Sequence, residues 1–169
     1  MKDEQDKRNT IDEMKIIREV NIQAENFYND AVKLGDHAAH VLRAQHRSQM
    51  TNLENIAESS FKATDILDFI KKQTARFSYW RQPFPEDKDA NTGFGERLKR
   101  YLENNLQTTL KNVCSPNRLN IGETTDEDKQ ERRRIYLLLI RQFIRQMVVE
   151  YEYQVSLGNT SPGNKKREA

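Results

Sequence analysis

Hydrophobic residues recur along most of the chain at steps of three and four, the spacing of one face of an α-helix. The first such stripe ends at Leu34. Thr10 and Glu13 have the spacing of a capping box, in which each side chain satisfies a free backbone amide of the first helical turn. Gly35 follows the last apolar position, where glycine commonly terminates a helix. The pattern therefore predicts a first helix that starts at Thr10 and ends before Gly35.

The second stripe follows Asp36, which can cap a new helix, and continues towards the prolines near residue 83. Within it, the segment Arg43–Gln49 is polar almost all round. Thr64 or Asp65 could cap a restarted helix if the chain breaks near Ser59–Asp65. Two alternatives stay open here, one long helix or a kinked pair of helices.

Pro83 and Pro85 end this pattern, because proline cannot donate a backbone hydrogen bond and restricts the residue before it. We predict a loop over residues 82–93, followed by a third amphipathic helix from Phe94 to Val113. A second predicted loop covers residues 114–125.

The last predicted helix runs to Gly158, and its cap is either Thr124 with Glu127 or Thr125 with Asp128. Between residues 135 and 155 its apolar residues occupy more than one stripe. A helix that is apolar this far round lies centrally, with neighbours on two sides.

These elements predict an all-α protein, because no segment alternates in the manner of a strand. The expected architecture is a bundle of four to five helices, one or two of them long, around the central C-terminal helix. We expect one domain over residues 9–157, a flexible N-terminus over residues 1–8 and a disordered tail over residues 158–169. From Asn159 onward that tail has no apolar residue except Ala169, so it has almost nothing to bury.

Composition adds limits on the cellular setting. The net charge is +2, from 28 basic and 26 acidic residues, so the molecule as a whole is not a polycation. A single cysteine, Cys114, excludes an internal disulfide. The longest apolar run, Ile135–Ile140, is too short for a membrane helix, and the charged N-terminus has no hydrophobic signal segment. We expect a cytoplasmic protein without a membrane partner.

Charge is unevenly distributed on the predicted last helix. Residues 132–145 contain five arginines and no acidic residue. Arg134, Arg141 and Arg145 lie at steps of seven and four and share one face. This face is either simply solvated or a contact surface for an anionic partner, because the arginine fork donates two parallel hydrogen bonds to a phosphate.

A second basic cluster lies where the second predicted helix ends, and we treat its members as candidate nucleic-acid contacts: Lys71, Lys72, Arg76 and Arg81. Trp80 stands beside them and could stack on a base. The alternative for this tryptophan is a place in the core or in an interface. A third basic group is interleaved with acidic residues and is most simply a solvated face: Arg97, Lys99 and Arg100.

Recognisable catalytic chemistry is missing from the sequence. His37 and His40 have a spacing that can hold a metal from a helix, with Asp36 nearby, but no further strong ligand shares their face, so we expect ordinary surface histidines. Phosphate-binding glycine loops, paired Cys-x-x-Cys motifs and a nucleophile elbow are absent. Cys114 has no candidate base nearby in sequence. We expect no catalytic residues, no metal, no cofactor, no small-molecule substrate, and no enzyme activity.

The order of elements resembles that of the small helical subunit of type III CRISPR effector complexes. The resemblance covers about Arg47 to Gln154, with "NLENIAESSFKATDILDFIKKQTAR", then the short "FGERLKRYLENNL", then the long closing "ERRRIYLLLIRQFIRQMVVEYEYQ". The longer N-terminal helix and the tail depart from the compact family pattern. The resemblance implies a non-catalytic subunit of an RNA-guided antiviral defence complex, stacked in copies along a guide–target duplex and touching RNA through basic helix faces.

The alternative is a protein–protein interaction or adaptor module without a nucleic-acid role. In that case the wide apolar surface of Ile135–Val155 and the long helix from Asp36 bind partner helices, and the arginines pair with acids of the partner. Salt separates the two classes, because nucleic-acid binding weakens log-linearly as counterions are released, whereas an apolar helix interface does not.

Overall fold

The computed structural model describes residues 1–85 and 91–158, and of residues 5–11 it describes the backbone only. These residues form an all-α fold without a β-strand, as the sequence predicts. One isolated antiparallel bridge joins Pro83 to Gly93. The elements are α1 (Lys2–Asn26), α2 (Tyr28–Leu42), α3 (Arg47–Ser59), α4 (Ala63–Arg76), the 3-10 turn η1 (Ser78–Arg81), α5 (Phe94–Arg100), the π-helical turn η2 (Tyr101–Asn105), α6 (Leu106–Val113) and α7 (Asp126–Ser156).

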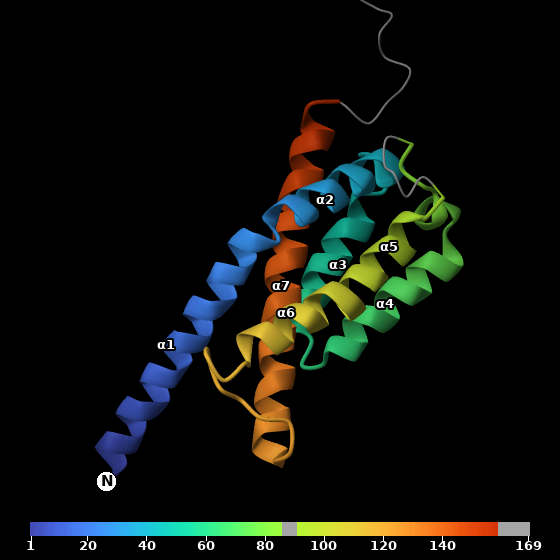
Figure 1. Cartoon of the computed structure of the whole chain (residues 1–169). Helices are drawn as coiled ribbons and strands as arrows, with labels where there is room; N and C mark the ends of the chain where they lie inside the picture. Colours follow the sequence, from blue (N-terminus) through green and yellow to red (C-terminus); the bar gives the residue numbers. More distant parts are fainter. Residues whose placement is uncertain (86–90, 159–169) are drawn as a thin grey trace, which may run out of the picture.

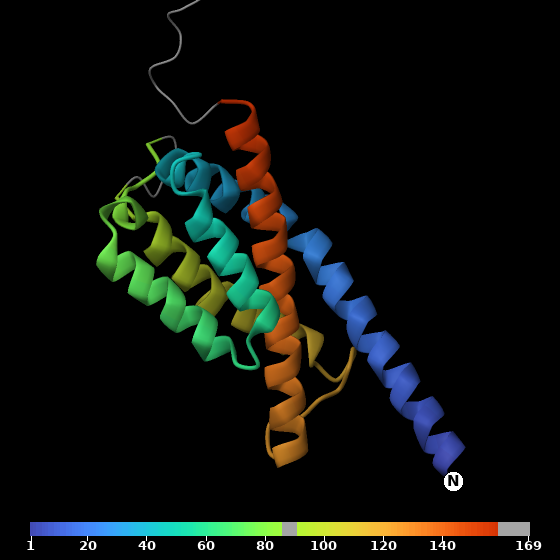
Figure 2. The ribbon, with the colours of Figure 1, turned by 180° about the vertical axis from the view of Figure 1, so that it is seen from behind.

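Helix α7 is the axis of the molecule, as its apolar circumference predicts. It contacts α1, α2, α3, α4 and α6, and eleven of its side chains are buried. Ile140, Ile144 and Met147 are fully buried. Figures 1 and 2 show α7 as the central rod, with α1 on one flank and α4 and α5 on the other. Within the described residues, no helix combines the length and the apolar character that a membrane crossing requires.

The N-terminal half differs from the prediction in where its helices begin and end. Helix α1 starts at Lys2, so Thr10 lies inside the helix and is not its cap. The break falls at Phe27 instead of Gly35. Gly35 lies inside α2, where a Cβ atom would come within 2.6 Å of the Glu150 Cβ and 2.7 Å of the Met147 carbonyl oxygen. Glycine is therefore needed here because α2 and α7 approach closely, and not because a helix ends.

Of the two alternatives for the segment after Asp36, the one long helix is wrong, because the segment divides twice. Asp36 lies within α2 and is not its N-cap, and a turn at residues 43–46 separates α2 from α3. Arg43 has a positive φ of 53° there. The second break, at residues 60–62, falls inside the predicted region, but the N-cap of α4 is Lys62 and neither Thr64 nor Asp65.

The C-terminal half agrees more closely. One continuous helical stretch covers α5, η2 and α6, from Phe94 to Val113. Connecting segments lie between Arg81 and Phe94 and between Val113 and Asp126. At the start of α7, the Thr125 side chain accepts a hydrogen bond from the Asp128 amide at 3.1 Å, which confirms one of the two predicted caps. The predicted disordered tail lies outside the described residues, apart from Gly158.

Candidate interaction surfaces

The arginine face of α7 is engaged within the chain. Arg134 donates two hydrogen bonds to the Glu13 carboxylate, at 3.0 and 2.6 Å, and one to Glu131 at 3.0 Å. These bonds lower the pKa of Glu13 and raise the pKa of Arg134. Glu13 belongs to α1, so this fork ties the arm-like first helix to α7. Arg134, which the sequence suggests as a nucleic-acid contact, is therefore also the side chain that holds α1 to α7.

Arg141 and Arg145 join α7 to the end of α3. Arg141 donates from Nε to the Ala57 carbonyl at 2.8 Å and from Nη2 to the Ser60 carbonyl at 2.7 Å. Both acceptors belong to the C-terminal turn of α3 or its cap, where carbonyl groups lack helical donors. Arg145 pairs with Glu58 at 2.6 Å. The three arginines thus have acceptors on α1 and α3, and their contact with nucleic acid stays a prediction.

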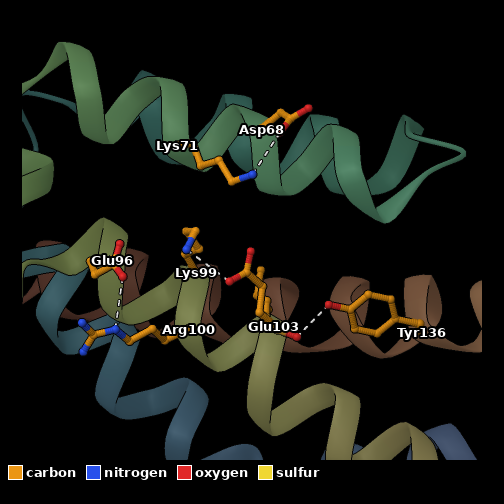
Figure 3. Close-up of polar contacts among 8 residues, drawn as sticks. Asp68, Lys71, Glu96, Lys99, Arg100, Glu103 and Tyr136 are labelled. Atoms are coloured by element: carbon orange, nitrogen blue, oxygen red, sulfur yellow. Dashed lines mark hydrogen bonds and ion pairs between the residues drawn. The ribbon is translucent and has the colours of Figure 1, made fainter.

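The second basic cluster does not act as one unit. Lys71 and Lys72 are exposed on α4, and Lys71 makes a long 3.4 Å contact to Asp68 (Figure 3). Arg76 is exposed and lies over the Phe77 ring at 5.5 Å. These three side chains give the C-terminal part of α4 an exposed basic surface.

Arg81 and Trp80 have other surroundings. Arg81 donates to the Thr74 and Ala75 carbonyls at 2.8 and 3.0 Å, which caps the C-terminus of α4. Trp80 is 0% exposed and packs against Phe94 with ring centroids 5.1 Å apart. Trp80 thus occupies the core position that was the alternative to base stacking, and its ring offers no free face.

The third basic group behaves largely as a solvated face. Arg100 pairs with Glu96 at 3.1 Å and Lys99 with Glu103 at 3.2 Å, both at a spacing of four residues (Figure 3). Arg97 departs from the pattern because it points inward to a histidine.

That histidine, His37, is the centre of a buried polar group that sequence reasoning missed. The ring is 0% exposed and its Nε2 lies 2.8 Å from the Gln82 carbonyl oxygen. A carbonyl only accepts, so Nε2 carries the proton, and Nδ1 accepts from Arg97 Nη1 at 3.0 Å. Phe84 stacks on the ring at 5.6 Å. His37 therefore fastens the 82–84 segment to α2 and α5. The signal that could have found it is its position in the buried stripe of α2.

The weak metal hypothesis has no support in this arrangement. His37 uses both ring nitrogens on protein partners, and His40 contacts the Phe84 ring edge-on at 5.3 Å. Among the described residues there is no group of three or more metal-ligating side chains. Cys114 is buried, and its burial raises the pKa of the thiol.

A polar groove of about 380 Å³ lies beside the α1–α2 junction, where η2 faces it. The Tyr101 hydroxyl donates to Asp30 at 2.8 Å across this groove, and the Tyr101 ring stacks on Phe143 at 4.4 Å. Asparagine and threonine side chains line the rest: Asn26, Asn104, Asn105, Thr108 and Thr109. The Tyr101–Asp30 bond links η2 to α2.

The clearest surface without a partner is the outer side of α1. The inner side, with Ile16, Val20 and Phe27, is buried in the core. Outside this buried side, large apolar side chains are exposed to solvent: Met14 at 65%, Ile17 at 49%, Ile22 at 39% and, at the start of α2, Tyr28 at 50%. Figures 1 and 2 show α1 standing at the edge of the molecule, its outer side uncovered by any other helix. We call these four residues, together with Arg18, Asn21 and Glu25, the outer face of α1.

A smaller apolar stripe lies at the C-terminal end of α7. Val149, Tyr153 and Leu157 are each more than half exposed and follow one another at steps of four residues. The spacing places them along one side of the helix. Among the other large apolar side chains described, Phe61 in the α3–α4 turn is the most exposed after Met1.

Comparison of the chain with protein-family models, with curated proteins and with solved structures gives no match. The function is therefore argued from these surfaces.

Proposed function

We propose that this chain is a protein-interaction subunit that binds a partner helix along the outer face of α1. The observation that carries the proposal is the set of large apolar side chains of α1 that are exposed to solvent. Single exposed apolar residues are ordinary on protein surfaces, whereas several together mark an interaction site. Met14, Ile17 and Ile22 lie within nine consecutive residues of α1, and Tyr28 follows at the start of α2.

The chemistry of the outer face fits a helix more closely than a small ligand or a strand. Apart from Tyr28, its residues belong to α1 alone and form an open, nearly flat surface, which suits the side of another helix. An amphipathic partner helix would pack its own apolar residues, at steps of three and four, between these side chains. The Arg134–Glu13 fork and the Arg118–Glu19 pair, at 2.9 Å, hold α1 to the body from the other side, so the partner meets a helix that is already placed.

A photo-crosslinking amino acid at Ile17 tests this proposal in cells that express the chain. We expect discrete adducts whose partner peptides are identified by mass spectrometry. The matched control carries the same amino acid at Asn52, an exposed position on α3. Equal, diffuse labelling from both positions would contradict an interface on α1.

A second candidate function is RNA contact through α4. The supporting observation is the exposure of Lys71, Lys72 and Arg76, of which Lys72 makes no ion pair with any described residue. Together with the resemblance to the small subunit of type III CRISPR complexes, this would make the chain a non-catalytic member of an RNA-guided defence assembly. Filter binding to a single-stranded RNA should then show a salt slope that falls by about 0.7 for each lysine removed. No binding at low salt would reject this candidate.

A further inference from the structure

The charges on the outer face of α1 have an arrangement that identifies the partner. Arg18 and Glu25 are the charged residues of this open surface, and both are exposed. Asn21 and Ile22 lie midway between them. Neither Arg18 nor Glu25 forms an ion pair with a residue in the described part of the chain. Successive helical residues are 100° apart, so positions 14, 18, 21 and 25 follow one line along α1.

We infer that the partner is a second copy of this chain, paired along α1 with the two helices antiparallel. The inference rests on the proposed function, that the outer face of α1 binds a helix. A two-fold axis through the Asn21–Ile22 region places Arg18 of each copy beside Glu25 of the other. An isologous contact of this kind must be self-complementary, and a positive charge on one side of the axis with a negative charge on the other meets that requirement.

The same charges disfavour the parallel arrangement. In a parallel pair in register, Arg18 would face Arg18 and Glu25 would face Glu25, and like charges across an interface oppose association. Arg18 and Glu25 lie on the contact line itself, so their charges act directly across the pair. The charge pattern thus selects the orientation, while the apolar residues supply the attraction.

The apolar residues lie along the same contact. Position 22 is next to the two-fold, so Ile22 of each copy lies beside Ile22 of the other, and Met14 lies on the line of Arg18 and Glu25. Helix α1 ends at Asn26. From position 14 to position 25 the contact is about 17 Å long at 1.5 Å per residue.

This pairing is closed, because each copy uses its outer face once and the two faces cover each other. It differs in this respect from head-to-tail stacking, which uses two different surfaces and continues indefinitely. We therefore expect a dimer and no larger species from this face.

Charge reversal tests the register by sedimentation velocity on the purified full chain over a range of concentrations. The unchanged chain should dimerise. Arg18→Glu and Glu25→Arg should each weaken dimerisation about tenfold or more, because each creates two like-charged pairs. The two variants mixed together should form a heterodimer, since every cross-copy pair is then opposite in charge. Lys111→Glu, an exposed reversal on α6, is the control and should dimerise like the unchanged chain.

Three results would overturn the inference. The first is a chain that stays monomeric at several hundred micromolar, the second a dimer insensitive to both reversals, and the third a mixture that associates no better than its components. Circular dichroism on each variant verifies the fold, which these exposed substitutions should preserve. If the Ile17 crosslinks in cells lead to a different protein while the purified chain is monomeric, self-pairing fails and the interaction function stands. If neither crosslinks nor dimer form, both fail.

Discussion

Arg141 offers a direct test of whether the arginines of α7 stabilise the fold. Its two hydrogen bonds reach carbonyl groups at the end of α3, at 2.8 and 2.7 Å. A hydrogen bond that involves a charged group contributes about 1.5–3 kcal/mol net, and a cation at a helix C-terminus adds about 0.3–1 kcal/mol. Because Arg141 is only partly buried, water can replace part of its interaction with the α3 carbonyls when the side chain is removed. We expect Arg141→Ala to lower the free energy of unfolding by about 2–4 kcal/mol.

Urea unfolding followed by circular dichroism measures this loss as a shift of the midpoint to lower urea at an unchanged slope. The stability of Arg141→Lys should lie between that of the unchanged chain and that of Arg141→Ala, because an ammonium group cannot reproduce the planar fork that reaches both carbonyls. The matched control is Arg133→Ala on the same helix. Arg133 is exposed and makes no hydrogen bond or ion pair with the described residues, so its loss should change stability by less than about 0.5 kcal/mol.

Equal stability of Arg141→Ala and Arg133→Ala would refute the reasoning, since it would mean that the α3 carbonyls are as well satisfied by water as by the guanidinium. If Arg141→Ala is as stable as the unchanged chain but binds RNA more weakly, the result would support Arg141 as a nucleic-acid contact.

Further predictions concern the core, a helix crossing and the response to alkali. Ile140→Ala should cost about 2–5 kcal/mol in chemical denaturation, because the side chain is fully buried; a near-zero change would contradict its core position. Gly35→Ala should lose about 1–2 kcal/mol, since overpacking against Glu150 outweighs the gain in helix propensity; a higher melting temperature would contradict the close approach. Burial raises the pKa of Tyr151 to about 12, so its neutral form stabilises the fold fully below the unfolded pKa of about 10 and loses this effect as pH rises towards 12. Melts between pH 9 and 11.5 should therefore fall less steeply for Tyr151→Phe, and equal slopes would count against this cause.

The sequence predicted well those features of the fold that depend on a few neighbouring residues. The Thr125 cap depends on contacts within three residues, and the wide apolar surface of α7 is visible from the repeat alone. Gly35 shows where the local rule fails. Glycine after an apolar stripe commonly ends a helix, but here it serves a contact with Glu150, 115 residues away, and no local pattern distinguishes the two uses.

The surfaces were harder to predict for the same reason. Between residues 132 and 145 the arginines have no acidic neighbour, yet their partners Glu13 and Glu58 lie 121 and 87 residues away in sequence. Charge counted along the chain therefore overstated the basic character of that face. The outer face of α1 was hidden by the spacing of its residues. Met14 and Ile17 fit the three-and-four spacing of the stripe that ends at Leu34, so the sequence places them with the buried residues of α1.

The position of α7 at the end of the helix order has a consequence for how the chain is made. A ribosome delivers α1 to α6 before the helix against which α1, α2, α3 and α6 pack. Until residues 135–155 emerge, the apolar sides of those helices have no central partner, and such nascent chains expose aggregation-prone surface. A chain cut before α7 would lack the helix against which these helices pack. Assembly of α1 to α6 into the described fold therefore waits for α7.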